Sequence, residues 1–442
     1  MKKYIDMTSG PIFHQLISFT LPLILGNVFQ LTYNMVDSII VGQFAGSEAL
    51  AAIGTSDPIM SLIILGVSGM CVGAGVLMSL FFGQNALDKL KEEMKTLTIL
   101  GIFFSLIVLV IGFGLSKYIL ILMKSPSSIL DMATIYLRVI FLGMPFTVLY
   151  NIYASALRSI GNSTTPLKYL MLSSLMNMGL DFILIYFFHM GVLGAGLATV
   201  FAEGISAILC VVYTEKNVSY LQINFKDYQL NKELVKQTLS YGGFTALQQA
   251  TQPIGKLFIQ GTVNSLGVTS IAAFNAIGKI EDIGLVPGRS ISTSITTFVA
   301  QNKGANNKER MEKGFREGIL LEIMVGIFIS LVLYICRFPL MSLFTSNQEI
   351  IFEGASYFSV MFLAYVLSNC SNGHQGYYRG IGYMKTTFFG SVTQISIRAI
   401  VSVLIVPFIG IRGIGYACMI GWSCQLVWQA IYRIYVYRKE FV

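Results

Sequence analysis

Of the 442 residues, 54% are hydrophobic and only 12% are charged, and the net charge is +8. An ordinary soluble protein carries about twice this share of charged residues, so the composition excludes a soluble globular protein. Lys and Arg gather in the cytoplasmic loops of membrane proteins, which accounts for the positive charge, and we expect no nucleic-acid partner. The composition therefore predicts an all-α polytopic protein embedded in the lipid bilayer.

Apolar runs separated by Gly, Pro and charged residues predict twelve transmembrane helices. Each run is long enough to cross a hydrocarbon core about 30 Å thick. The predicted spans are 13–43, 48–83, 93–115, 129–157, 164–188, 192–214, 233–263, 268–301, 315–336, 349–378, 384–406 and 411–435. Pro22 and Pro145 lie inside spans, and we expect them to act as hinges because proline removes a backbone hydrogen bond.

The distribution of Lys and Arg predicts the orientation of the spans. With the N-terminus inside, 21 of these residues fall on the inner side, 4 on the outer side and 5 within spans. Because positive charge marks the cytoplasmic side, we expect both termini in the cytoplasm.

The chain also repeats itself, which indicates a duplicated unit. The three pairs of matching segments are 83–85 with 301–302 (offset 217), 158–161 with 379–382 (offset 221), and 191–196 with 410–415 (offset 219). Six spans in each copy give a parallel repeat of two pseudo-symmetric six-helix bundles. We expect an N-terminal lobe at 1–214, a cytoplasmic linker at 215–232 and a C-terminal lobe at 233–442.

Several polar residues lie at a similar depth in the first lobe. An ionisable side chain inside a span costs several kcal/mol unless it is paired, protonated or hydrated, so it is a candidate for function. A rise of about 1.5 Å per residue gives roughly 10 Å of depth from the outer surface for four residues, Asp37, Tyr136, Asp181 and Thr199. Asn177 and Glu203 lie four residues from Asp181 and Thr199 and share their helix faces.

Carboxylate, amide and hydroxyl oxygens at one level suit a monovalent cation, or two carboxyls that share a proton. Asp37, Asn177, Asp181 and Thr199 are therefore candidate ligands of Na+, with Tyr136 and Glu203 beside them. The alternative is that Asp37 and Asp181 only hydrogen-bond neighbouring helices.

The second lobe differs in charge at the corresponding positions. Lys256 matches Asp37 at the offset of 219, and Arg398 falls near the counterpart of Asp181. Glu281 either neutralises one of these cations or faces the substrate path. The candidate path residues are Tyr33, Asn34, Gln248, Gln252, Lys256, Glu281 and Arg398. We expect Glu322, near the cytoplasmic end of its span, to be solvated.

Several motifs together resemble one family. They are 30–37 (QLTYNMVD), 157–166 (LRSIGNSTTP), 177–181 (NMGLD), 191–199 (GVLGAGLAT) and 301–305 (QNKGA). The chain resembles the multidrug and toxic compound extrusion (MATE) transporters, within them the bacterial DinF-like branch. The resemblance covers essentially the whole chain.

This resemblance implies an antiporter of the bacterial inner membrane that exports small organic, often cationic, compounds in exchange for H+ or Na+ by alternating access. It implies no cofactor and a cation site at Asp37, Asn177, Asp181 and Thr199. Glu203 departs from the family, in which Gln is common. We expect a monomer. We expect no enzymatic activity, since no span contains a DDxxD, HExxH or GxSxG motif. The alternative is a lipid-linked oligosaccharide or lipid flippase of the same superfamily. Such a protein needs a cationic cavity, and Lys256, Arg289 and Arg398 could supply the positive charge.

Overall fold

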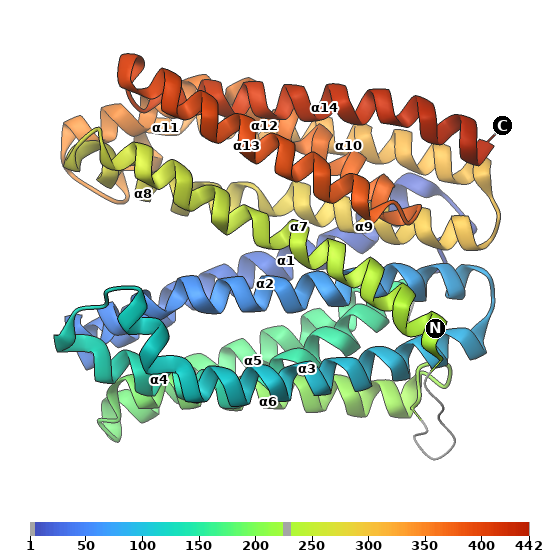
Figure 1. Cartoon of the computed structure of the whole chain (residues 1–442), viewed down its shortest axis with the longest axis horizontal. Coiled ribbons are helices and arrows are strands. Elements are labelled where there is room, and N and C mark those ends of the chain that lie inside the picture. Colours follow the sequence, from blue (N-terminus) through green and yellow to red (C-terminus); the bar gives the residue numbers. More distant parts are fainter. Residues whose placement is uncertain (1–4, 224–230, 442) are drawn as a thin grey trace. The chain divides into compact units, whose positions relative to one another are not determined.

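The computed structural model describes residues 5–223 and 231–441, and these are helical almost throughout (Figure 1). No strand occurs among the described residues, so the predicted all-α fold is confirmed. The long apolar runs form long helices because a helix satisfies every backbone polar group within its own segment, as a bilayer requires.

Six helices and two short π-helices account for the first half of the chain. They are α1 (Ile12–Ile40), η1 (Val41–Ala45), α2 (Ser47–Gly83), α3 (Leu87–Leu122), α4 (Ser127–Ser159), α5 (Thr164–Phe182), η2 (Ile183–Phe187) and α6 (Gly191–Asn217). The six predicted spans match these elements, with each π-helix continuing the helix before it.

Eight helices account for the second half. They are α7 (Lys232–Asn264), α8 (Val268–Gly284), α9 (Val286–Gly304), α10 (Lys308–Ile335), α11 (Arg337–Ser342), α12 (Gln348–Gly380), α13 (Met384–Ile409) and α14 (Arg412–Phe441). The predicted span 268–301 corresponds to α8 and α9, which are separated by a break at Leu285. Pro287 follows the break and cannot donate a backbone hydrogen bond to the preceding turn.

Within the described residues, nine segments are long and apolar enough to cross a membrane. The other three predicted spans correspond to α7, to α8 with α9, and to α14. In α7 the glutamines and Lys256 lower the hydropathy, and the break at Leu285 leaves two shorter helices in place of one long one.

The residues group into two compact units whose boundaries lie inside helices. Unit 1 comprises 1–6 and 22–246, and unit 2 comprises 7–21 and 247–442. The chain therefore passes from one unit to the other within α1, before Pro22, and within α7, after Ala246. Part of the predicted linker, 224–230, lies outside the described residues, and the predicted lobe boundaries stay a prediction.

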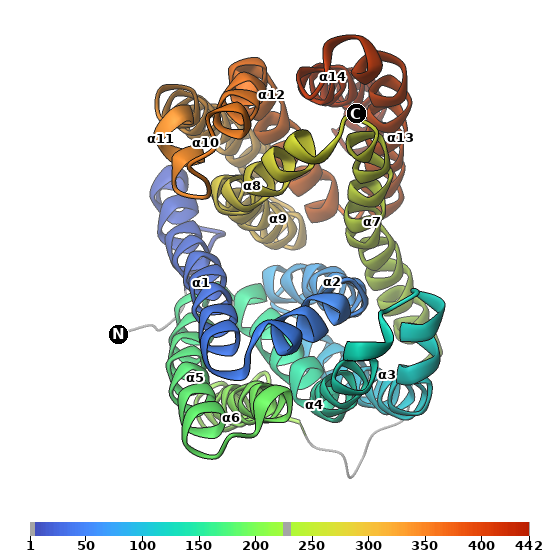
Figure 2. The same ribbon diagram turned by 90° about the vertical axis from the view of Figure 1, so that its left-hand side faces the viewer.

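Small residues allow close helix packing in unit 1, where Figure 2 shows α2 to α6 gathered in one bundle. A side chain at Gly69 would meet the Cα of Ala246 at 2.5 Å, and one at Gly73 would meet the Cα of Gly242 at 2.6 Å. The first half of α7 thus lies against α2 at two small residues on each helix. The two residues are four positions apart in each helix. Such pairs let helix backbones approach closely in membranes.

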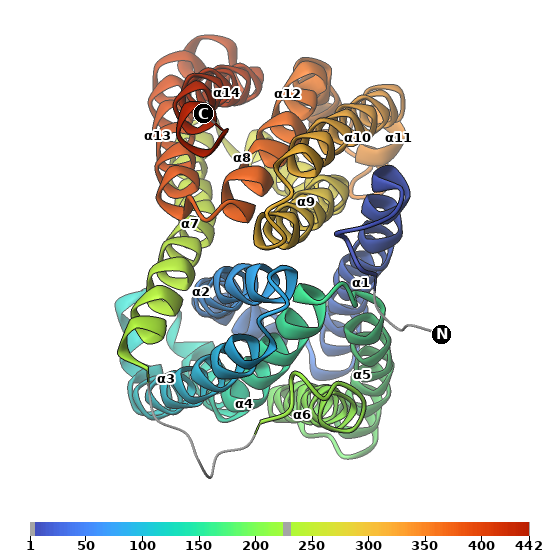
Figure 3. The ribbon, with the colours of Figure 1, turned by 90° about the vertical axis from the view of Figure 1, so that its right-hand side faces the viewer.

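In unit 2, α12 is the central helix, and its tyrosines 357, 365, 377 and 378 are fully buried. Figure 3 shows α9, α10 and α12 side by side and α13 paired with α14, which agrees with their packing. Residues 7–21 also belong to this unit. The amide of Asn302 donates to the Met7 carbonyl (2.9 Å), and the Met7 N–H donates to Gln301 (3.2 Å).

The backbone repeats between the two halves. Positive φ angles recur in matched turns, at Gly46 (95°) and Gly267 (97°), and at Gly161 (87°) and Gly382 (88°). Asn85 (55°) and Asn306 (54°) form a third pair, and all three pairs have an offset of 221. The predicted match of Asn85 with Asn302 is therefore wrong. Asn302 is buried in α9, whereas the counterpart turn lies four residues later.

Candidate cation site

The strongest candidate site in unit 1 combines a carboxyl from α1 with one from α5. Asp181 is fully buried, Asn177 is 3% exposed, and Asp37 is half-buried. The carboxyls of Asp37 and Asp181 are within hydrogen-bonding reach of each other. Depth counting predicted that these two residues share one level, and the structure brings them together.

Oxygen atoms in this site lack hydrogen-bond donors from the protein. Asp37 Oδ1, both carboxyl oxygens of Asp181 and the side-chain oxygen of Asn177 are buried and make no hydrogen bond. The amide nitrogen of Asn177 is also without a partner. Buried polar atoms are nearly always paired, and an unpaired one is costly. Four acceptor oxygens in one place fit a shared proton or a hard monovalent cation.

Two tyrosines and a third carboxyl surround the pair. Tyr136 on α4 lies in the electrostatic field of Asp37, Asp181 and Glu203, and so does Tyr33 on α1. Glu203 accepts a hydrogen bond from Thr147, two residues after Pro145 in α4. These acids and phenols therefore form one neighbourhood within unit 1.

The remaining predicted residues of unit 1 are less closely tied to the acids. The Thr199 hydroxyl donates to the Ala195 carbonyl of its own helix (3.0 Å), which leaves its oxygen lone pairs as acceptors. Asn34 is exposed on α1, three residues before Asp37.

A π-helix follows each of the two acidic residues, a feature that the apolar pattern did not indicate. The segment η1 begins four residues after Asp37, η2 begins two residues after Asp181, and the two segments contact each other. Phe44, Phe182 and Tyr186 pack around this contact, with Phe182 and Tyr186 stacked at 5.1 Å. π-helical turns are frequent at functional sites.

The predicted residues of unit 2 separate into two groups. Gln248 is buried and donates to Ser391 Oγ (3.2 Å), whereas Gln252 and Lys256 are exposed on α7. On α8, Glu281 accepts hydrogen bonds from two tyrosines of α12 and interacts electrostatically with Arg398 of α13. The structure thus brings Glu281 and Arg398 together. Lys256 Nζ lies against α8, 3.5 Å from the position of a Cβ at Gly278, one turn before Glu281.

One expectation about unit 2 is wrong. Glu322 is not solvated: it is fully buried, and neither of its carboxyl oxygens has a hydrogen-bond partner. Its electrostatic neighbour is Arg379 of α12, whose guanidinium donates to Ser292 (2.7 Å). The packing of α10 on α12 buries this position.

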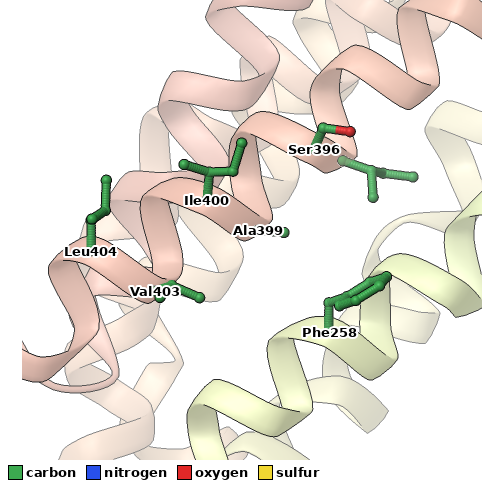
Figure 4. A pocket seen from close by; sticks show the side chains of 7 residues that line it. Phe258, Ser396, Ala399, Ile400, Val403 and Leu404 are labelled. Atoms are coloured by element: carbon green, nitrogen blue, oxygen red, sulfur yellow. The ribbon is translucent and has the colours of Figure 1, made fainter.

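A separate cavity of about 500 Å³ lies between α7 and α13 in unit 2 (Figure 4). Phe258 lines it from α7, and Ile400 and Leu404 line it from α13. Ser396 is its one polar lining side chain, and the cavity includes none of the predicted polar residues. Its apolar lining suits contact with hydrocarbon rather than with an ion.

Comparison with known families gives the identity. The MatE family model matches residues 22–183 and 245–404. The chain belongs to the MatE family. The two matched segments of this MATE transporter begin at 22 and 245, within two residues of the points in α1 and α7 at which the chain changes units.

Curated relatives and a solved structure agree with the MATE assignment. The probable multidrug resistance protein YoeA of Bacillus subtilis is 27% identical over 356 residues, covering 79% of the chain and 77% of YoeA. The multidrug export protein MepA of Staphylococcus aureus is 24% identical and covers 98% of the chain and 95% of MepA. An outward-facing multidrug resistance MATE family transporter has the same fold, with a TM-score of 0.93 at 21% identity and coverage of 99% and 98%. The chain is therefore an all-α, multi-pass membrane transporter of the twelve-helix MATE fold.

Proposed function

We propose that this transporter is an antiporter that exports small organic compounds, often cationic ones, in exchange for H+ or Na+ bound at Asp37 and Asp181. The observation that carries the proposal is the set of buried acceptor oxygens without donors at this pair and at Asn177. The names of the relatives, which are multidrug resistance and export proteins, support the substrate class.

Charge repulsion gives the coupling a physical basis. Two carboxylates about 4 Å apart repel each other by about 4 kcal/mol at an effective dielectric constant of about 20. A bound proton or Na+ removes this repulsion and draws α1 towards α5, whereas its release separates them. An ion shifts a two-state equilibrium only through different affinities for the two states, and this pair supplies such a difference.

The hinge at Pro22 connects this site to alternating access. Asp37 and Pro22 lie on the part of α1 that belongs to unit 1, whereas the part before Pro22 belongs to unit 2. Ion binding at Asp37 therefore acts on a helix that is divided between the units. Pro145 is the corresponding hinge in α4, next to the Thr147 that donates to Glu203.

The charge distribution supports the rest of the proposal. The excess of Lys and Arg on one side supports a bacterial inner-membrane protein with both termini in the cytoplasm, and we propose a monomer. A flippase for lipid-linked oligosaccharides is less well supported, because Glu281 is an electrostatic neighbour of Arg398 and offsets part of its positive charge.

The proposal is tested with purified protein in liposomes, using efflux of a cationic dye under separately imposed Na+ and pH gradients. We expect Asp37→Asn and Asp181→Asn each to lower gradient-driven export at least tenfold while dye binding in detergent persists. Export at the wild-type rate by either variant, with the gradient intact, contradicts the assignment. The gradient that drives the wild type identifies the coupling ion.

A further inference from the structure

A polar stripe runs along the buried face of α13 in unit 2. Ser391, Gln394, Arg398 and Ser402 are spaced three to four residues apart and so share one helix face. Ser391, Gln394 and Ser402 are each at most 4% exposed. The opposite face carries the apolar side chains that line the cavity in Figure 4. An arginine in the middle of a buried polar stripe within a span is expensive to maintain and indicates function.

A buried hydrogen-bonded cluster lies close to Arg398. Tyr357 and Tyr365, both fully buried, donate to the same Glu281 oxygen at 3.0 and 2.7 Å. Glu281, Tyr357, Tyr365 and Cys418 are the electrostatic neighbours of Arg398. The two tyrosines already donate hydrogen bonds to this carboxyl oxygen. Arg398 therefore acts on Glu281 as a counter-charge, and the Nε of Arg398 makes no hydrogen bond.

Hydrogen-bond donors dominate among the unpaired atoms around this stripe. Six buried side-chain atoms on α7, α13 and α14 have no partner in the described part of the chain, and four of them can donate. These are Arg398 Nε, Ser402 Oγ, Gln425 Nε2 and Gln429 Nε2. The site in unit 1 has the opposite character, since four of its five unpaired atoms are acceptor oxygens. Gln425 Nε2 lies near Gly390, about two turns from Arg398, so the unpaired donors beside the guanidinium are its own Nε and Ser402 Oγ. Acceptors suit a cation, and these donors suit an anion.

We propose that Arg398 binds the carboxylate of exported compounds that carry one, and that Glu281 is the internal counter-charge that this carboxylate replaces. The inference rests on the proposed export function and deepens it by assigning a substrate class, organic anions and zwitterions, to unit 2. A guanidinium binds a carboxylate through two parallel hydrogen bonds, and Nε is one of its donors. Ser402 lies one turn from Arg398 and supplies a further hydroxyl donor.

A matched pair of dyes isolates the carboxylate. Rhodamine 110 is an acid, and rhodamine 123 is its methyl ester, so the two differ only in this group. Binding of each to the purified full-length protein in neutral detergent is measured by fluorescence anisotropy, with no ion gradient present. We expect Arg398→Gln to weaken rhodamine 110 binding at least tenfold, since a charge-assisted hydrogen bond lost in a buried site costs that much or more. Rhodamine 123 binding is not weakened, because the ester does not use the guanidinium.

A second variant gives an effect of opposite sign. Glu281→Gln removes the competing carboxylate and should tighten rhodamine 110 binding severalfold. Lys279→Gln is the matched control, since it removes one positive charge from an exposed position on α8, and we expect both affinities to stay within twofold. If Arg398→Gln does not elute as a folded monodisperse protein, Glu281→Gln decides the question by itself.

Equal weakening of both dyes by Arg398→Gln, or unchanged or weaker rhodamine 110 binding in Glu281→Gln, overturns the proposal. Absence of rhodamine 110 binding to the wild type does the same. The proposed export function fails separately, if rhodamine 123 is not exported from liposomes under either cation gradient. Binding of rhodamine 110 that depends on Arg398 would then still establish the carboxylate site.

Discussion

Replacing Gly73 by Ala tests whether the first half of α7 is fixed to unit 1. A Cβ at Gly73 would lie 2.5 Å from the Tyr241 carbonyl carbon and 2.6 Å from the Gly242 Cα, and it would also meet the Tyr241 oxygen. All three atoms are backbone atoms and cannot rotate away. The two helices must therefore separate or tilt, and overpacking of this kind typically costs 1–3 kcal/mol.

Gly66, on the same helix, is the matched control. A Cβ there has no atom within 4 Å. Ala is favoured over Gly in a helix by about 1 kcal/mol, so Gly66→Ala should stabilise the protein slightly. The two variants should differ by about 3 kcal/mol in the free energy of unfolding. This corresponds to a difference of about 6–12 °C in the unfolding midpoint for a unit of roughly 200 residues.

The assay is thermal unfolding in detergent, followed by loss of the monodisperse peak in size-exclusion chromatography. Gly73→Ala should unfold at a lower temperature than the wild type and Gly66→Ala at the same or a higher one. Equal midpoints for the two variants would show that α7 does not pack on α2 at this position. The division of α7 between the units would then be incorrect as well.

Three further substitutions probe the hinge, the N-terminal segment and Glu203. Pro22→Ala should lower the rate of dye export severalfold and leave dye affinity within twofold, because it affects bending of α1; a loss of binding would argue against a hinge. Arg310→Met removes three charge-assisted hydrogen bonds to the segment 7–21. It should weaken the packing of this segment on unit 2 by about 3 kcal/mol or more, which is measured as faster proteolysis of the segment. Unchanged proteolysis would contradict this packing. Thr147→Val removes the hydroxyl that donates to Glu203 and should lower the free energy of unfolding by about 1–3 kcal/mol. Thr147→Ser keeps the hydroxyl and should keep the wild-type stability. Similar unfolding midpoints for the two variants would refute this contact.

The sequence predicts the helices well because their main determinant is local. A run of apolar residues longer than the bilayer requires forms a helix wherever it packs. The prediction for α3, 93–115, is too short, because its ends carry charged or polar residues that project from the apolar core, and the helix extends over Leu87–Leu122. The break at Leu285 is signalled by Pro287, although the position of the break depends on the final structure.

The pair of Asp37 and Asp181 could be found from depth alone, because the two residues lie six and seven residues before the outer ends of their predicted spans. The two π-helices beyond them depend on packing between η1 and η2 and leave no clear pattern in the sequence. Burial of Glu322 was missed for a related reason. Its neighbour Arg379 is 57 residues away, and only the packing of α10 on α12 brings them together.

The division of α1 and α7 between the two units has a mechanical consequence. The segment before Pro22 is held in unit 2 through Asn302 and Arg310, and the first half of α7 is held in unit 1 through Gly73 and the buried hydrogen bond from Thr238 to Glu93. Any rotation of one unit against the other must therefore bend both helices near 22 and 247. Asp37 lies 15 residues beyond the first of these points, about 22 Å along a helix. In the proposed mechanism, an ion bound at Asp37 therefore acts far from the bend at Pro22, and a small gain in contact with α5 shifts the position of the whole outer part of α1.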